Sequence, residues 1–192
     1  MKNANMAEVG VGRYFKDKAR KLRTRGATLI ETAAVLAIVA ILALGALQLI
    51  TTVNQARLGS QAANELNTIQ QAVRSLYGSQ SNFAGISSEV LVSTKAVPQS
   101  MVSGTGLKHA FTGAITIEPA AAASGANSGF EVTFEGLPQD VCVKMLTADL
   151  GRGVYAAGVG TMVGQDAGLP LTPAAAALQC NSTYNNVAWV FY

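Results

Sequence analysis

Residues 27–50 decide the fold, and their sequence is ATLIETAAVLAIVAILALGALQLI, in which Glu31 is the single charged residue among 24. A helix rises about 1.5 Å per residue, so this stretch covers about 36 Å, enough to cross a hydrocarbon core about 30 Å thick. A secretory signal peptide has a shorter apolar region, of roughly 7–15 residues, with a small-residue cleavage site after it. The stretch therefore predicts a membrane-spanning helix, and its simplest interpretation is an uncleaved signal anchor.

The 26 residues before this stretch carry a concentrated positive charge. They hold eight Lys and Arg residues against Glu8 and Asp17, whereas residues 27–192 hold six basic residues against nine acidic ones. Positive residues beside a membrane span remain in the cytoplasm, so the bulk of the chain is expected on the other side of the membrane. Nucleic-acid binding requires a basic stripe on the folded part, and because residues 27–192 are mildly acidic, no direct nucleic-acid binding is expected.

Glu31 is the unusual residue of the apolar stretch. A carboxylate inside a membrane segment costs up to about 3 kcal/mol at the centre and less near an end, so it indicates a function and a partner. If the chain is cut between Gly26 and Ala27, the new α-amino group carries a positive charge one helical turn from Glu31. Within one chain this arrangement only eases burial. Between packed helices, it lets the carboxylate of one subunit neutralise the amine of the next.

This combination of residues resembles the class III signal of type IV pilins. The resemblance rests on a basic leader that ends in Gly26, followed by ATLIE (residues 27–31) at the start of a long apolar helix. It implies that a membrane prepilin peptidase cuts after Gly26 and methylates the amine of Ala27, and that Glu31 is the assembly residue. The long leader and a first mature residue other than phenylalanine resemble the type IVb branch, which includes bundle-forming and toxin-coregulated pilins and the pilins of conjugative-plasmid thin pili.

The helix is expected to continue past the apolar stretch. Residues 51–77 contain no proline, and apolar residues recur there every three or four positions among Gln, Asn, Arg and Ser, which predicts an amphipathic helix that stops at Gly78. One helix over residues 27–77 would then have an apolar stem (27–50) and an amphipathic half that packs on a globular head. Glycine weakens a helix by about 1 kcal/mol relative to alanine, so local melting of the stem on assembly is expected to begin at Gly45.

Residues 78–192 predict a small α+β head. Alternating apolar and polar residues indicate strands over 114–118 and 130–135, with a small-residue loop over 119–129 between them, and residues 187–192 indicate a final strand. Helices are expected over 138–150 and directly after Thr172, the N-cap, and the segments 79–113 and 151–173 are expected to form surface loops. The fold class is therefore α+β and pilin-like: a long N-terminal helix, its apolar part the hydrophobic stem, packed on a small antiparallel-sheet head.

Cys142 and Cys180 are the two cysteines of the chain, and both lie in the part expected outside the cytoplasm. A single pair in an oxidising compartment favours a disulfide, which stabilises a small domain by about 2–4 kcal/mol, while two unpaired buried thiols are the alternative. Neither has a nearby histidine or a CxxC partner, so a metal or catalytic role is disfavoured. The resemblance to type IV pilins implies the bridge, because their C-terminal region is commonly closed by one.

The sequence offers few candidate residues for a catalytic or metal site. His109 is the single histidine and is expected in a loop or at the surface. A nucleophile, a base and an orienting group cannot be assembled from one histidine, so neither enzymatic activity nor a cofactor nor a metal is expected.

The resemblance implies a structural function. The chain would be the prepilin of a major type IVb pilus subunit, serving conjugation or adhesion, with further copies of itself, the prepilin peptidase and the pilus assembly machinery of the inner membrane as partners. The precursor is expected in the bacterial inner membrane and the mature subunit in an extracellular pilus. Two alternatives stay open: a signal-anchored periplasmic binding domain that keeps residues 1–26 and has no need of Glu31, and a minor pilin or secretion pseudopilin.

Overall fold

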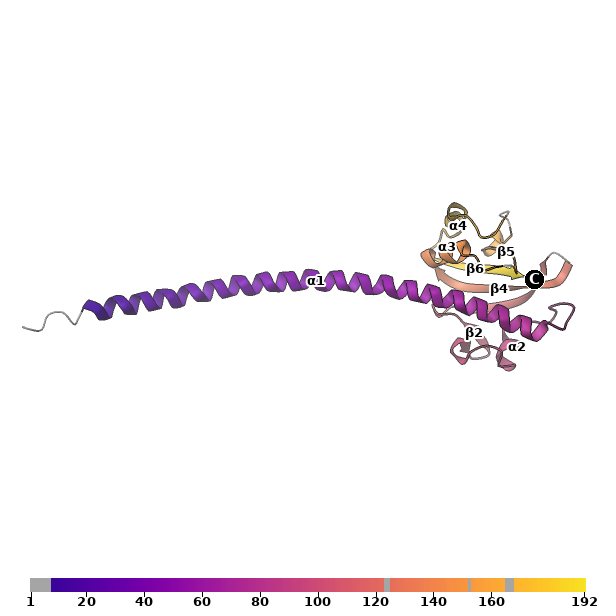
Figure 1. The fold of residues 1–192 in the computed structure, drawn as a ribbon, viewed down its shortest axis with the longest axis horizontal. Coiled ribbons are helices and arrows are strands. Elements are labelled where there is room, and N and C mark those ends of the chain that lie inside the picture. The colour runs from indigo at the N-terminus through magenta and orange to yellow at the C-terminus, as the bar shows by residue number, and fades with distance from the viewer. Residues whose placement is uncertain (1–7, 123–124, 152, 165–167) are drawn as a thin grey trace, which may run out of the picture. The chain divides into compact units, whose positions relative to one another are not determined.

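The computed structural model describes residues 8–122, 125–151, 153–164 and 168–192, and the chain divides into two compact units, Met1–Thr52 and Val53–Tyr192. One helix, α1 (Glu8–Tyr77), contributes to both units (Figure 1). It begins well before residue 27, and the first seven residues of the expected leader lie outside the described residues. It ends directly before Gly78, where a Cβ atom would lie 2.7 Å from the carbonyl oxygen of Arg74, so glycine permits the chain to leave the helix there.

The head contains, among its described residues, a six-stranded antiparallel sheet in the order β1-β2-β3-β4-β6-β5. This arrangement confirms the α+β, pilin-like class expected from the sequence. The strands are β1 (Val102–Ser103), β2 (Gly106–Lys108), β3 (Ala114–Ala122), β4 (Gly125–Pro138), β5 (Val154–Val159) and β6 (Tyr184–Phe191). The helices of the head besides α1 are α2 (Ser88–Ser93), η1 (Gln99–Met101), α3 (Gln139–Thr147), η2 (Gly160–Met162) and α4 (Pro173–Gln179).

The prediction of a loop over residues 119–129 is wrong, because β3 and β4 continue through most of this segment. Pro119 pairs with Phe130, and Ala120 pairs with Gly129. Proline donates no hydrogen bond and is confined to sheet edges; β2 pairs only with the first two residues of β3, so Pro119 lies where β3 has a free edge. A Cβ atom on Gly129 would lie 2.2 Å from the carbonyl oxygen of Phe191, so the glycine permits the close approach of β6.

The prediction of surface loops over 79–113 and 151–173 is confirmed only in part, because short helices and strands interrupt both segments. The first contains α2, β1 and β2 and buries Leu91, Met101 and Leu107, and the second contains the edge strand β5. These elements span two to six residues each, too few for a periodic pattern to show in the sequence.

The predicted helices of the head are confirmed with shifted ends. α3 stops at Thr147 rather than at residue 150, because the backbone of Ala148 is extended and the Thr147 hydroxyl donates to the carbonyl oxygen of Val143 at 2.9 Å. α4 follows Thr172, whose side chain accepts a hydrogen bond from the Ala175 amide, as expected of an N-cap.

The core of the head forms where the C-terminal part of α1 packs on the sheet, along which it runs in Figure 1. Leu66, Ile69 and Val73 project from one face of the helix and belong to the same buried cluster as the sheet residues Phe130 and Trp189. Residues three and four positions apart share a helix face, so the apolar stripe predicted for residues 51–77 buries itself against the head. The head therefore completes its core within Val53–Tyr192.

Candidate functional site

The stem is the part of the molecule whose apolar side chains are left exposed by the rest of the described chain. The window Thr28–Ala46 has a mean hydropathy of 2.4, and none of it is buried. Leu29 is 74% exposed and Ile30 is 76% exposed. Ile41, which lies past the middle of the stem, is 70% exposed. A helix that is apolar on all sides is stable in a membrane or among other apolar helices, so the stem requires one or both of these surroundings.

Glu31 lies near the N-terminal end of this window. Its exposed side chain borders a shallow groove with Thr28, Thr32 and the apolar side chains of Val35 and Leu36. Ala27 precedes it by four residues, so both lie on one face of α1, whose backbone is helical through Gly26 and Ala27.

Residues 28–46 contain no Lys or Arg, so the stem offers Glu31 no basic side chain of its own.

Gly45 lies in the same exposed stem, and the space around it is open. A Cβ atom there would meet nothing within 4 Å, whereas one on Gly59, in the half of α1 that packs on the head, would contact Val141 at 3.8 Å. Both glycines are in α1, so both accept alanine without a collision, and they form a matched pair of test positions.

We expect Gly45→Ala to strengthen the stem helix by about 1 kcal/mol. If assembly requires the stem to melt at Gly45, this variant lowers filament yield, while Gly59→Ala, which adds the same methyl group elsewhere in α1, leaves it unchanged. The measurement is the amount of subunit sheared from cells relative to total subunit. Equal filament yields from both variants would contradict melting at Gly45.

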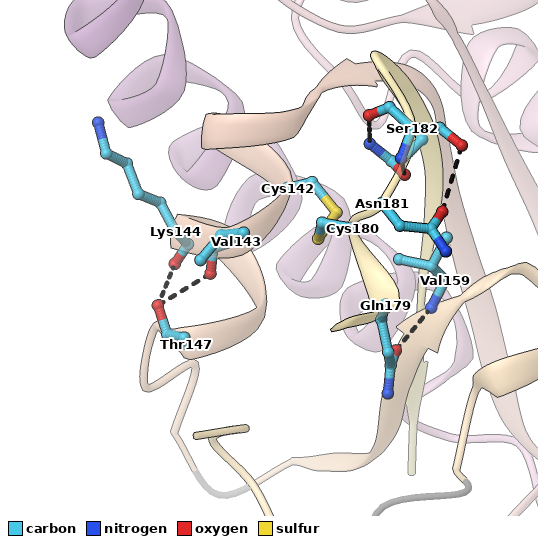
Figure 2. Close-up of a disulfide and its surroundings, with 10 residues drawn as sticks. Cys142, Val143, Lys144, Thr147, Val159, Gln179, Cys180, Asn181 and Ser182 are labelled. Carbon is cyan, nitrogen blue, oxygen red and sulfur yellow. Dashed lines mark hydrogen bonds between the residues drawn. A yellow bond between two sulfur atoms is a disulfide. The ribbon is translucent and has the colours of Figure 1, made fainter. Parts of the chain in front are cut away.

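The disulfide between Cys142 and Cys180 is present and confirms the sequence-based expectation; Figure 2 shows it between α3 and the end of α4. The two Cα atoms are 6.0 Å apart, and both cysteines are fully buried. Beside it, the buried Gln179 accepts a hydrogen bond from the Val159 amide at 3.0 Å, which links α4 to β5. The bridge therefore fastens α3, α4 and the edge of the sheet into one structure.

His109 lies in the loop after β2, one of the two positions expected for it, but its side chain is buried and only 3% exposed. Its ring stacks on Phe134 with centroids 5.1 Å apart. The Phe111 amide donates to Nδ1 at 3.2 Å, which leaves Nε2 to donate to the carbonyl oxygen of Glu135 at 2.8 Å. These two bonds require the neutral ring, and burial lowers the pKa of His109 below 6.5, although hydrogen bonding to Glu135 and the charges of Glu65 and Glu135 oppose that shift.

This arrangement predicts that the head loses stability on acidification. The unfolded chain binds a proton at His109 near pH 6.5 and the folded chain only at lower pH, so in that window stability falls by up to about 1.4 kcal/mol per pH unit. Denaturant unfolding of the full chain in detergent measures the effect. The pH is varied between about 7.5 and about 5, a range that includes the ordinary histidine pKa of about 6.5. In His109→Gln this part of the pH dependence should disappear; a variant with the slope of the original chain would contradict the assignment.

Glu65 is a structural residue that the sequence analysis missed. It is 9% exposed, and its carboxylate accepts hydrogen bonds from the Ala110 amide at 2.8 Å and from Gln61 Nε2 at 2.9 Å. The bond from Ala110 joins α1 to the segment that carries His109, and the bond from Gln61, also on α1, holds the carboxylate in place. The available signal was a charged residue next to Leu66 and three positions after Ala62, on the stripe that is otherwise apolar.

No group of three His, Cys, Asp or Glu side chains that could hold a metal ion occurs among the residues that the structure describes. The arrangement presents an apolar helix with one carboxylate, attached to a disulfide-closed head.

Comparisons with known proteins agree with this architecture. A sequence model of the PilS N-terminal family matches residues 57–192. The major structural subunit of the bundle-forming pilus of Escherichia coli O127:H6 (strain E2348/69 / EPEC) is 28% identical over 173 residues, which cover 83% of this chain and 89% of that protein, and the corresponding subunit of Escherichia coli O111:H- has the same values.

Two solved structures are also similar. TcpA, a type IV pilin from Vibrio cholerae El Tor biotype, has a TM-score of 0.49 and 21% identity over 70% of this chain and 98% of its own. A type IV b pilin from Salmonella typhi has a TM-score of 0.49 and 22% identity over 68% of this chain and 97% of its own. Because the family model covers more than half of the chain, the chain belongs to the PilS N-terminal family.

Proposed function

We propose that this chain is the prepilin of the major structural subunit of a type IVb pilus. Residues 1–26 form a leader that is removed after Gly26, residues 27–77 form the long helix, and residues 78–192 complete the head. The mature subunit polymerises through its stem, and Glu31 pairs with the Ala27 amine of a neighbouring subunit. The filament serves adhesion or conjugation.

The observation that carries this proposal is the fully exposed apolar stem on a head whose core is already complete. A binding domain with a membrane anchor would also have an apolar helix, but it would gain nothing from a carboxylate inside it. The similarity to major subunits of bundle-forming pili favours a major subunit over a minor pilin or a pseudopilin.

The proposed pairing places each subunit in register. An unpaired carboxylate among apolar side chains costs several kcal/mol, and an adjacent ammonium group offsets that cost only when the two charges approach closely. A subunit that enters the filament one step out of place leaves both charges unpaired. The Glu31–Ala27 contact therefore selects one arrangement of neighbouring stems, while apolar burial supplies the driving force.

The proposal also assigns partners and location. The precursor lies in the bacterial inner membrane with its basic leader in the cytoplasm, where the prepilin peptidase and the assembly machinery act on it. The mature subunit is part of an extracellular filament made of copies of itself. Its role is structural rather than enzymatic.

The proposal is tested by blocking the cut. Glycine lets the backbone approach a peptidase closely, so we expect Gly26→Val to leave a full-length chain in the membrane and no filaments. The matched control is Gly12→Val, the same substitution at another glycine of the leader, which should be processed normally.

Electron microscopy of sheared material, with immunoblots of the membrane fraction, reads out both variants. Filaments from Gly26→Val at the level of the unmodified chain would contradict processing at this site. A full-length, membrane-bound protein in the unmodified strain would instead support the signal-anchored alternative.

A further inference from the structure

Trp189, the single tryptophan of the chain, has a buried polar atom that the fold does not satisfy. The side chain is fully buried on β6, and its ring meets Phe134 edge-on with centroids 5.5 Å apart. The indole Nε1–H has no hydrogen-bond partner among the residues that the structure describes. Buried donors in folded proteins almost always have a partner, from the protein or from ordered water, so this orphan donor indicates a site for an acceptor.

A small cavity adjoins Trp189. Its volume is about 30 Å³, and it lies between the end of α3, the turn that follows and the segment at Leu169 and Pro170. A water molecule occupies about 30 Å³ in the liquid and needs a cavity of at least about 10–15 Å³. The cavity therefore has room for a water molecule.

The walls of the cavity supply further polar groups. Met145 and Leu146 line it, and they belong to the last turn of α3, where carbonyl groups have no donor within the helix. The Leu146 carbonyl oxygen accepts a hydrogen bond from the Leu171 amide at 3.1 Å and retains one lone pair. A bound water needs two to four polar partners, and the indole with the carbonyl groups of Met145 and Leu146 supplies that number.

We propose that this cavity is a binding site for one structural water molecule, which accepts a hydrogen bond from Trp189 Nε1 and donates to acceptors at the end of α3. The water connects the central strand β6 to the turn that follows the disulfide-bonded helix. It thereby gives a hydrogen-bond partner to Trp189 Nε1, the single buried polar side-chain atom without one among the described residues.

Proton NMR of the full chain in detergent micelles tests the proposal, because one tryptophan gives one indole resonance. In a rotating-frame experiment we expect a dipolar cross-peak between the indole proton and water, with the sign opposite to that of chemical exchange. An exchange peak alone, or no cross-peak with water, would show that the cavity is dry and overturn the proposal.

Two variants of β5 locate the water. Ala157 lines the cavity and pairs with Trp189, so Ala157→Val fills the space and should abolish the dipolar cross-peak. The matched control is Ala156→Val, the same change at the neighbouring residue on the opposite face of the strand, which should keep it. A cross-peak that survives in Ala157→Val, or is lost in both variants, places the water elsewhere and overturns the assignment; the measurement on the original chain stands even if a variant fails to fold.

Discussion

Replacing Glu31 with valine is expected to abolish filament formation while the subunit still enters the membrane. The substitution removes the one charge of residues 28–46, so the free energy of insertion becomes more favourable, by up to about 3 kcal/mol at the helix centre and less near its end. Assembly loses the group that selects the neighbouring amine. The measurement compares subunit in the sheared fraction with subunit in the membrane fraction.

Three further variants separate charge from shape at this position. Glu31→Gln keeps the size of the side chain and removes the charge, so it should fail as Glu31→Val does. Glu31→Asp keeps the charge on a shorter side chain and should retain part of the filament formation. Thr32→Val makes the adjacent exposed position more apolar and should assemble normally. Normal filament levels from Glu31→Val would show that the charge has no role in assembly.

Removing the disulfide is expected to have the largest effect on the stability of the head. Cys142 and Cys180 close a loop with a sequence separation of 38, for which chain entropy gives a stabilisation of about 4 kcal/mol. Small domains have free energies of unfolding of about 5–15 kcal/mol, so the double variant Cys142→Ala, Cys180→Ala should be partly unfolded or degraded. Limited proteolysis and the steady-state level of the subunit in cells measure the loss.

The same protein before and after reduction is the control for this prediction. Reduction of the unmodified chain should lower its protease resistance to that of the double variant, while the double variant itself should not respond to reductant. If protease resistance is the same with and without the bridge, the disulfide does not stabilise the head, and the 4 kcal/mol expectation fails.

The parts of the fold that were predictable from the sequence have long or unambiguous signals. The stem is a stretch of 24 mostly apolar residues with one charge, and the disulfide has a single pairing because the chain has two cysteines. Thr172 before a proline and an alanine run is a local signal for a helix start, and the structure confirms it. Each of these depends on adjacent residues or on a count, so tertiary context does not change them.

The missed parts depend on contacts between distant residues. The end of β3 and the start of β4 are rich in Ala and Gly, which have low strand propensity, and they are strands because they pair with each other and because Gly129 allows β6 to approach β4. His109 is buried because Phe134, 25 positions later, provides a ring on which it stacks, and the short β5 is held by β6. Of the candidate site, the sequence identified Glu31 and the cysteines, whereas Glu65 and the orphan donor of Trp189 became visible only in three dimensions.

Intact mass spectrometry of subunits sheared from cells tests the central claim most directly, because the proposed function places cleavage between Gly26 and Ala27 before every later step. We expect the mass of residues 27–192 with one added methyl group and with Cys142 and Cys180 oxidised. A chain that still begins at Met1 and occurs only in the membrane fraction, in cells with an active prepilin peptidase, would contradict the account.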